Sequence, residues 1–241
     1  MNSDDARAKL KKYLQPAPSQ VDLSDDSLMK RAAKQVVPAN ARPFMAVALT
    51  DLVRPGERRK AARLSQREPL LLHLGSASSR KPGWVNIDLV GHRGELAWNL
   101  SRPLPFADDS ADGIFHEHLI EHLALEDGLG LTDECHRVLK PGGVLRIGVP
   151  DALAYARAYA CGDPEFIERN RPGRPTPLLA LLEAFYSWGH KTMYDFELLS
   201  LVCGAAGFEQ IEQRRFGESR IQPSPDSEHR RLESIYVEAI K

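Results

Sequence analysis

The stretch from Leu70 to Leu89 constrains the fold of this chain more than any other. It opens with the apolar run Leu70–Leu74, which predicts a buried strand, and continues into the small residues Gly75–Ser79. A second apolar segment, Val85–Ile87, ends on one carboxylate, Asp88. This order of strand, small-residue turn, strand and terminal acid is how a nucleotide-binding α/β sheet begins.

The turn differs from the dinucleotide-binding fingerprint. The pattern Gly-x-Gly-x-x-Gly is absent, and Gly75 alone holds a glycine position. Asp88 follows Gly75 by 13 residues, fewer than the roughly 20 of a dinucleotide fold, which leaves little room for a full helix between the strands. A nicotinamide oxidoreductase is therefore disfavoured, because the glycines that cradle its phosphates are missing.

Beyond this stretch, segments typical of strands alternate with segments typical of helices. Strands are expected over 95–100, 111–115, 144–149, 208–215 and 234–240, and helices over 119–138, 152–160, 177–186 and 194–206. The alternation predicts a mostly parallel sheet, and the last two strands are expected to form an antiparallel hairpin at its edge. Residues 162–177 contain four prolines and two glycines and predict an inserted loop or lid.

The length of 241 residues suits one α/β domain with an extension. We divide the chain into an N-terminal helical extension, 1–68, partly flexible, and a main domain, 69–241. Short helices are expected over 6–14 and 24–36, and an exposed basic helix over 54–67, before Pro69. The extension is expected to pack on the sheet or to cover the active site.

Charge is uneven along the chain. Residues 1–68 contain 14 Lys and Arg against 8 Asp and Glu, although the whole chain has a net charge of −1. This basic arm is either a solvated helix or a contact for a phosphate-rich partner or an anionic membrane surface.

No apolar run approaches about 18 residues, so no membrane span is expected. The polar N-terminus and three scattered cysteines favour a cytoplasmic protein without a secretory signal.

Three ordered motifs follow the opening stretch. They are Pro103–Asp112, His118–Leu123 and Arg137–Gly143, and a later Gly207-Phe208 fits the same series. Over residues 70–212 the chain resembles class I S-adenosylmethionine-dependent methyltransferases, in particular the small-molecule branch labelled methyltransferase type 11. The resemblance implies a Rossmann-like, mostly parallel seven-stranded sheet with helices on both faces, in which the last strand is inserted antiparallel. The opening resembles a subgroup that accompanies glycan and cell-surface polysaccharide genes.

The resemblance also implies S-adenosyl-L-methionine as cofactor and assigns residues to it. Its implied binding residues are Gly75, Ser76, Ala77, Asp88, Leu89, Asn99, Leu100, His116 and Glu117. The first three would line the turn under methionine and ribose, and Asp88 would hold the ribose hydroxyls. Leu89, Asn99 and Leu100 would face the adenine, and His116 and Glu117 would lie near the methionine. The sequence departs from the family where Ala77 and Ser79 replace glycines and where His73 and Asn99 replace acids.

Methyl transfer to a hydroxyl needs a base that removes its proton. The candidates are the histidines expected near the carboxyl ends of strands, which are His116, His118, His122 and His190. We predict His118 and His190 as catalytic, and His190 and Tyr194 as substrate-binding, with no metal ligand. The competing interpretation is that these residues brace a helix and a packing turn.

The leading prediction is a methyltransferase acting on a small molecule or a sugar or glycan, at oxygen, with no nucleic acid partner. One alternative is a non-catalytic scaffold of the same fold that has lost the cofactor, motivated by the altered turn. A remote alternative is a zinc hydrolase, because His118-x-x-Glu121-His122 matches an inverted zinc-protease motif. Glu183 or Glu197 would then supply the third ligand.

Overall fold

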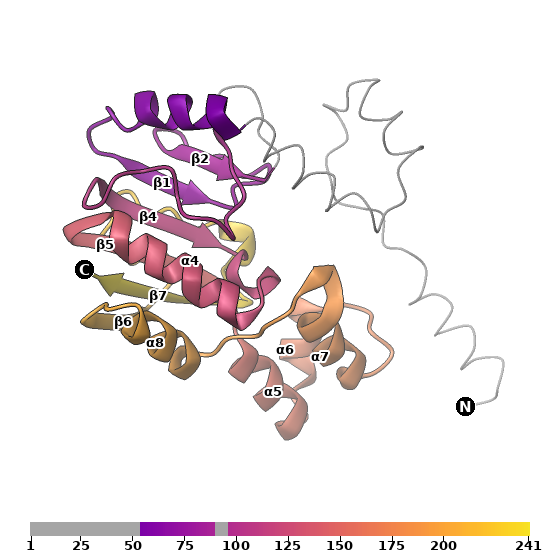
Figure 1. Cartoon of the computed structure of the whole chain (residues 1–241). Coiled ribbons are helices and arrows are strands. Elements are labelled where there is room, and N and C mark those ends of the chain that lie inside the picture. Colours follow the sequence, from indigo (N-terminus) through magenta and orange to yellow (C-terminus); the bar gives the residue numbers. More distant parts are fainter. Residues whose placement is uncertain (1–53, 90–95) are drawn as a thin grey trace, which may run out of the picture.

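The computed structural model describes residues 54–89 and 96–241, which form one sheet with associated helices (Figure 1). The helices expected over 6–14 and 24–36 lie outside the described residues. The strands are β1 Leu71–Leu74, β2 Val85–Asp88, β3 Leu96–Ala97, β4 Ala111–Glu117, β5 Leu139–Pro150, β6 Gln210–Arg214 and β7 Ser234–Ile240. The helices are α4 Leu125–Val138, α5 Ala152–Cys161, α6 Pro164–Asn170, α7 Pro177–Tyr186 and α8 Phe196–Ala205, and residues 54–64 are also helical.

The order of the strands confirms the predicted fold class. In the described residues seven strands are arranged as β3-β2-β1-β4-β5-β7-β6. Strands β1 to β5 are mutually parallel, whereas β7 is antiparallel to both β5 and β6. The last strand of the chain is thus inserted between β5 and the edge strand β6, as the resemblance implies.

The two faces of the sheet are packed differently. One face carries the main apolar core, to which α4, α8 and Ala61 of the helix over 54–64 contribute. The opposite face has a smaller apolar cluster around Trp84, Phe115 and Ile221, all from strands or loops. Turns and bends connect β1 to β2 without a helix, as expected from their short spacing.

Three local expectations need correction. The helix expected over 119–138 is split into a 3-10 helix, η2 (Ile120–His122), and α4, because Leu123 and Ala124 are extended. The insert over 162–177 contains α6, which Asp163 caps by accepting the Phe166 N–H at 3.0 Å. The helix expected to be exposed over 54–67 buries Ala61 completely, and its Glu57 carboxylate accepts the Ala97 N–H at 2.9 Å.

Candidate functional site

The carboxyl ends of β1, β2 and β4 meet at one edge of the sheet. Leu74 is in register with Ile87 on one side and with His116 on the other. Strand order reverses at β1, which has β2 and β4 as neighbours. In open α/β sheets the crevice at such a switch point is where ligands bind.

The turn after β1 brings four of the predicted cofactor residues together. Gly75 has φ +66°, and a Cβ there would lie 2.7 Å from Leu119 Cδ1, so a side chain is excluded both by conformation and by space. The Ala77 N–H donates to Asp88 Oδ2 at 2.9 Å, and the Ser76 N–H donates to the Ile87 carbonyl at 3.1 Å. Asp88 is therefore held against the turn, and its predicted contact with ribose hydroxyls stays a prediction. Ala77 takes φ +42°, a conformation that the expected glycine would adopt more easily.

The remaining predicted cofactor residues lie at or beyond the ends of β2, β3 and β4. Leu100 and His116 are buried, and His116 is in register with Leu74 at the end of β1. The Glu117 carboxylate accepts hydrogen bonds from the Tyr236 hydroxyl at 2.9 Å and the Ser227 N–H at 3.1 Å. Asn99 accepts the Ser101 N–H at 3.1 Å, and Leu89 is half-buried next to Asp88.

His73, which stands where the family has an acid, is a buried structural residue. Its Nδ1 is 3.0 Å from Asn86 Oδ1, and its ring stacks on Phe115 with centroids 5.2 Å apart. Burial lowers the pKa of His73 to about 4, so the ring is neutral at pH 7. Asn86 also binds the backbone of Lys81 at 2.8 and 3.0 Å, so this pair fixes the loop that leads into β2.

The segment after β4 turns sharply at His118. This residue has φ +52°, and its N–H donates to the Gly148 carbonyl at 2.8 Å. Its Nε2 lies 2.8 Å from Ser234 Oγ, and its Nδ1 lies 3.4 Å from Glu121 Oε1. Burial, followed by the positive charge of Arg230, lowers the pKa of His118 to about 2. Both ring nitrogens of this predicted base thus already face protein groups.

The loop before α8 is attached to the same segment by its backbone. The Lys191 and Thr192 N–H groups donate to the Glu121 carbonyl at 2.8 and 3.2 Å. The Thr192 hydroxyl donates to the Leu123 carbonyl at 3.0 Å. These bonds place His190 beside η2.

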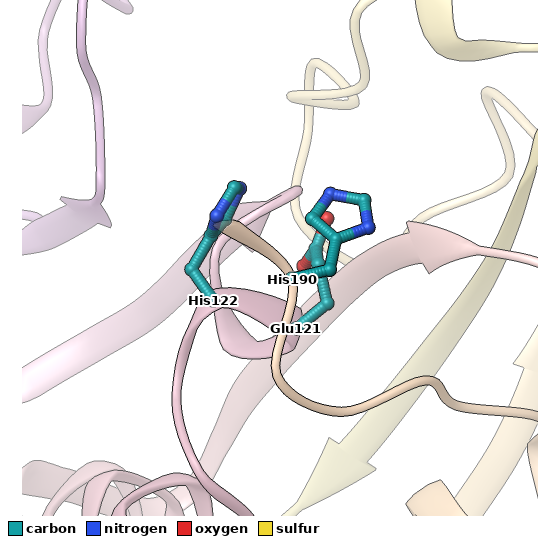
Figure 2. A group of neighbouring side chains, drawn as sticks. All are labelled: Glu121, His122 and His190. Atoms are coloured by element: carbon teal, nitrogen blue, oxygen red, sulfur yellow. The ribbon is translucent and has the colours of Figure 1, made fainter. Parts of the chain in front are cut away.

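Glu121, His122 and His190 form a group of neighbouring side chains (Figure 2). One ligand atom from each lies within 4.8 Å of the other two. Glu121 is completely buried, and neither of its carboxylate oxygens has a hydrogen-bond partner. Burial raises the pKa of Glu121 to about 8, and burial lowers the pKa of His122 to about 4 and that of His190 below its usual value.

The structure changes the grouping that the zinc-protease pattern predicts. That pattern needs His118 and His122 on one face of a helix, but His118 precedes η2 and is turned toward Ser234. His190, from a distant loop, stands in the group instead. In the sequence, Glu121 is indicated as a functional residue only by its place in that pattern.

Tyr194, predicted to face substrate, is an interior residue. Its side chain is 0% exposed, and its hydroxyl has no hydrogen-bond partner. A Cβ added at Gly128 would lie 2.8 Å from this hydroxyl, which shows how closely α4 packs over it. Burial and the nearby Glu121 raise the pKa of Tyr194 to about 12.

A hollow of about 770 Å³ opens at the opposite end of β1. Leu71, at the start of that strand, lines it together with Arg67, Trp84 and Gln222. Because Gly75 lies at the other end of β1, this hollow is not part of the edge that holds the turn and the Glu121 group.

Two comparisons with known proteins give matches to methyltransferases. Residues 89–147 match the family model described as "Methyltransferase domain". A protein of Mycolicibacterium smegmatis, described as "Probable S-adenosylmethionine-dependent methyltransferase", is 35% identical over 75 residues. That match covers 31% of this chain and 23% of the relative, so the chain matches only about a quarter of the relative's length. Both matches agree with the resemblance to S-adenosylmethionine-dependent methyltransferases.

Solved structures with similar folds include two methyltransferases. A SAM-dependent methyltransferase from Archaeoglobus fulgidus is 16% identical, with a TM-score of 0.45, over 80% of this chain and 94% of that one. A possible histamine N-methyltransferase from Thermotoga maritima is 16% identical, with a TM-score of 0.44, over 88% of this chain and 97% of that one.

Within residues 54–89 and 96–241, no helix has the length and apolar character needed to cross a membrane.

Proposed function

We propose that this protein is an S-adenosylmethionine-dependent methyltransferase that methylates a small molecule or the sugar of a glycan, at an oxygen atom. The observation that carries the proposal is the Asp88 carboxylate, held 2.9 Å from the Ala77 N–H at the switch point of the sheet. Such an acid, at the tip of the second strand and beside a glycine turn, suits a ribose. The family match and the relative support the same activity.

The residues at the edge of the sheet fit this cofactor. Gly75 leaves its backbone bare on the turn, and Asp88 presents a carboxylate that can accept hydrogen bonds from ribose hydroxyls. The bound cofactor supplies an electrophilic methyl group. The turn and Asp88 then orient the cofactor against an acceptor that enters from the side of η2.

For the base, the structure favours His190 over His118. Both nitrogens of His118 face Ser234 or Glu121, and its side chain is nearly buried. His190 is half-buried, and because its Nδ1 donates to the Ala184 carbonyl at 2.8 Å, its Nε2 is the nitrogen that carries the lone pair. A neutral imidazole at the edge of the site can take the proton of an acceptor hydroxyl.

We further propose a cytoplasmic location and an N-terminal extension that ends near residue 68. Cys135, Cys161 and Cys203 are all free thiols, which fits a reducing compartment. The basic character of the extension makes a peripheral contact with an anionic surface an additional proposal.

Calorimetric titration with S-adenosylmethionine and S-adenosylhomocysteine tests the proposed function. We expect binding in the micromolar range, about −8 kcal/mol, that Asp88→Ala abolishes. Asp88→Asn keeps an acceptor for the Ala77 N–H and separates loss of the charge from loss of the turn. Asp133→Ala, at an exposed position on α4, is the matched control and should bind as the wild type does.

Two outcomes contradict the proposal. One is a folded wild-type protein that binds neither compound, which would favour the non-catalytic scaffold. The other is binding that Asp88→Ala leaves unchanged, which would place any cofactor elsewhere.

A further inference from the structure

We propose that Glu121, His122 and His190 form a binding site for a divalent transition-metal ion of the Zn²⁺ type. One ligand atom from each residue lies within 4.8 Å of the other two. Metal–ligand bonds of about 2.1 Å place the atoms of a tetrahedral site about 3.4 Å apart. The three donors would therefore have to approach one another by up to about 1.4 Å to share one ion.

The carboxylate of Glu121 provides an independent indication of a missing partner. Its side chain is 0% exposed, and neither of its oxygens receives a hydrogen bond from residues 54–89 or 96–241. A buried carboxylate in this state is unfavourable unless a positive charge or donor compensates it. The nearest ionisable nitrogen is His118 Nδ1 at 3.4 Å, whose ring also faces Ser234.

The arginines near this group are paired with another acid. Arg230 forms an ion pair with Glu233 at 2.8 Å, and Arg171 forms one with the same carboxylate at 2.9 Å. The charge of Arg230 also attracts the Glu121 carboxylate, but the Glu121 oxygens receive no hydrogen bond from either arginine. A cation between Glu121 and the two imidazoles would supply the direct contact that the arginines do not make.

His190 has the orientation of a metal-binding histidine. Its Nδ1–H donates to the Ala184 carbonyl at 2.8 Å, which fixes the tautomer and leaves Nε2 to act as a ligand. Metal-binding histidines characteristically make such a hydrogen bond with their other nitrogen. The backbone bonds from Lys191 and Thr192 to Glu121 hold the two ligand segments together before any ion binds.

The donor set selects the kind of ion. Two imidazole nitrogens and one carboxylate suit Zn²⁺ or a related transition metal, whereas Mg²⁺ and Ca²⁺ prefer oxygen ligands. Three protein ligands leave one coordination position open. Because His122 and His190 are only half-buried, that position faces outward. Resting on the proposed methyl transfer, that position would hold a hydroxyl oxygen of the acceptor, and the ion would lower the pKa of that hydroxyl. With the ion bound, the Nε2 lone pair of His190 would be used for the metal, so the ion would replace His190 in the role of base.

Titration of the metal-free full chain with Co²⁺, followed by visible absorption, tests the site. We expect one Co²⁺ per chain with the intense bands of a four-coordinate ion, and displacement by one equivalent of Zn²⁺ but not by Mg²⁺. Glu121→Gln and His190→Gln should each weaken binding at least tenfold. His229→Gln, which removes an exposed histidine, should bind as the wild type does.

The proposal is wrong if the wild-type chain takes up no stoichiometric Co²⁺ or Zn²⁺. It is equally wrong if Glu121→Gln and His190→Gln, shown to be folded by circular dichroism, bind as tightly as the wild type. S-adenosylhomocysteine binding is measured in parallel on metal-free Glu121→Gln. If metal-free Glu121→Gln still binds S-adenosylhomocysteine but no longer binds Co²⁺, the metal site is supported. If the wild-type protein itself binds no S-adenosylhomocysteine, only the proposed methyl transfer is contradicted.

Discussion

The two ends of the candidate site are built in opposite ways. The turn after β1 and the acid that ends β2 come from one short stretch, and a backbone N–H ties Ala77 to Asp88 at 2.9 Å. The group around Glu121 joins η2 to a loop 69 positions away, through hydrogen bonds such as that from Thr192 to Leu123. The first is a turn whose backbone donates an N–H to one carboxylate. The second combines the buried Glu121, whose carboxylate receives no hydrogen bond from the described residues, with two half-buried histidines. The geometry of the first end therefore depends on local backbone structure, whereas the geometry of the second depends on packing between segments that are distant in the sequence.

The largest effect is expected at Gly75, where the local geometry is tightest. Gly75→Ala should lower the free energy of unfolding by about 3 kcal/mol, because it adds strain at positive φ to overpacking against Leu119. Gly83→Ala is the matched control, since Gly83 has φ +82° but no atom within 4 Å of an added Cβ, and should cost about 1 kcal/mol. Urea unfolding measures both. Equal losses would show that the contact with Leu119 carries no constraint.

The next effect concerns the pH dependence that the buried carboxylate imposes on the metal-free protein. Burial raises the pKa of Glu121 in the folded state to about 8, above the value of about 4.5 in the unfolded chain. The preference of the folded state for the protonated carboxyl contributes fully to the free energy of unfolding below about pH 4.5, and this contribution is lost as pH rises through 8. Glu121→Gln should therefore stabilise the chain at pH 8, by roughly 2 kcal/mol, and much less at pH 5. Chemical unfolding in the presence of a chelator checks this. A variant that is less stable than the wild type at pH 8 would refute it.

His73, beneath the turn, should show the opposite pH dependence. Burial lowers its pKa to about 4, so the unfolded chain takes up the proton first, and stability is lost as pH falls from about 6.5 through 4. The loss approaches about 1.4 kcal/mol for each pH unit in that window. His73→Gln should reduce the fall in the free energy of unfolding between about pH 6.5 and 4. It should leave unchanged the pH dependence that Glu121 causes up to about pH 8. An unaltered acid limb would exclude His73 as its source.

The smallest effect is expected at the hydrogen bond that joins the two distant segments. Thr192→Val removes the donor to the Leu123 carbonyl and should cost about 1 kcal/mol, together with a measurable loss of Co²⁺ affinity. Thr132→Val removes a comparable bond to the Gly128 carbonyl within α4 and should lower stability without changing Co²⁺ binding. Identical metal affinities in the two variants would argue that the segment around His190 is positioned by other contacts.

The strands and the turn were predictable because their signals are local. The apolar run before Gly75 and the acid after Ile87 lie in one stretch, and strand pairing in register places them side by side. The resemblance carried by the later motifs implied the inserted antiparallel strand, which the pairing of β7 with β5 and β6 confirms. The α6 helix was missed, although Asp163 followed by Pro164 is a start signal, because the prolines around it favoured a loop.

By itself, the sequence determined a mostly parallel α/β sheet with an antiparallel hairpin at its edge and the juxtaposition of Gly75 with Asp88, since both follow from short-range order and from strand pairing. Only the tertiary structure decided that His118 turns away at φ +52°, that Tyr194 is buried and that His190 joins Glu121. The physical reason is that these positions depend on backbone hydrogen bonds between segments far apart in the chain, such as those from Lys191 and Thr192 to Glu121, which no local pattern encodes.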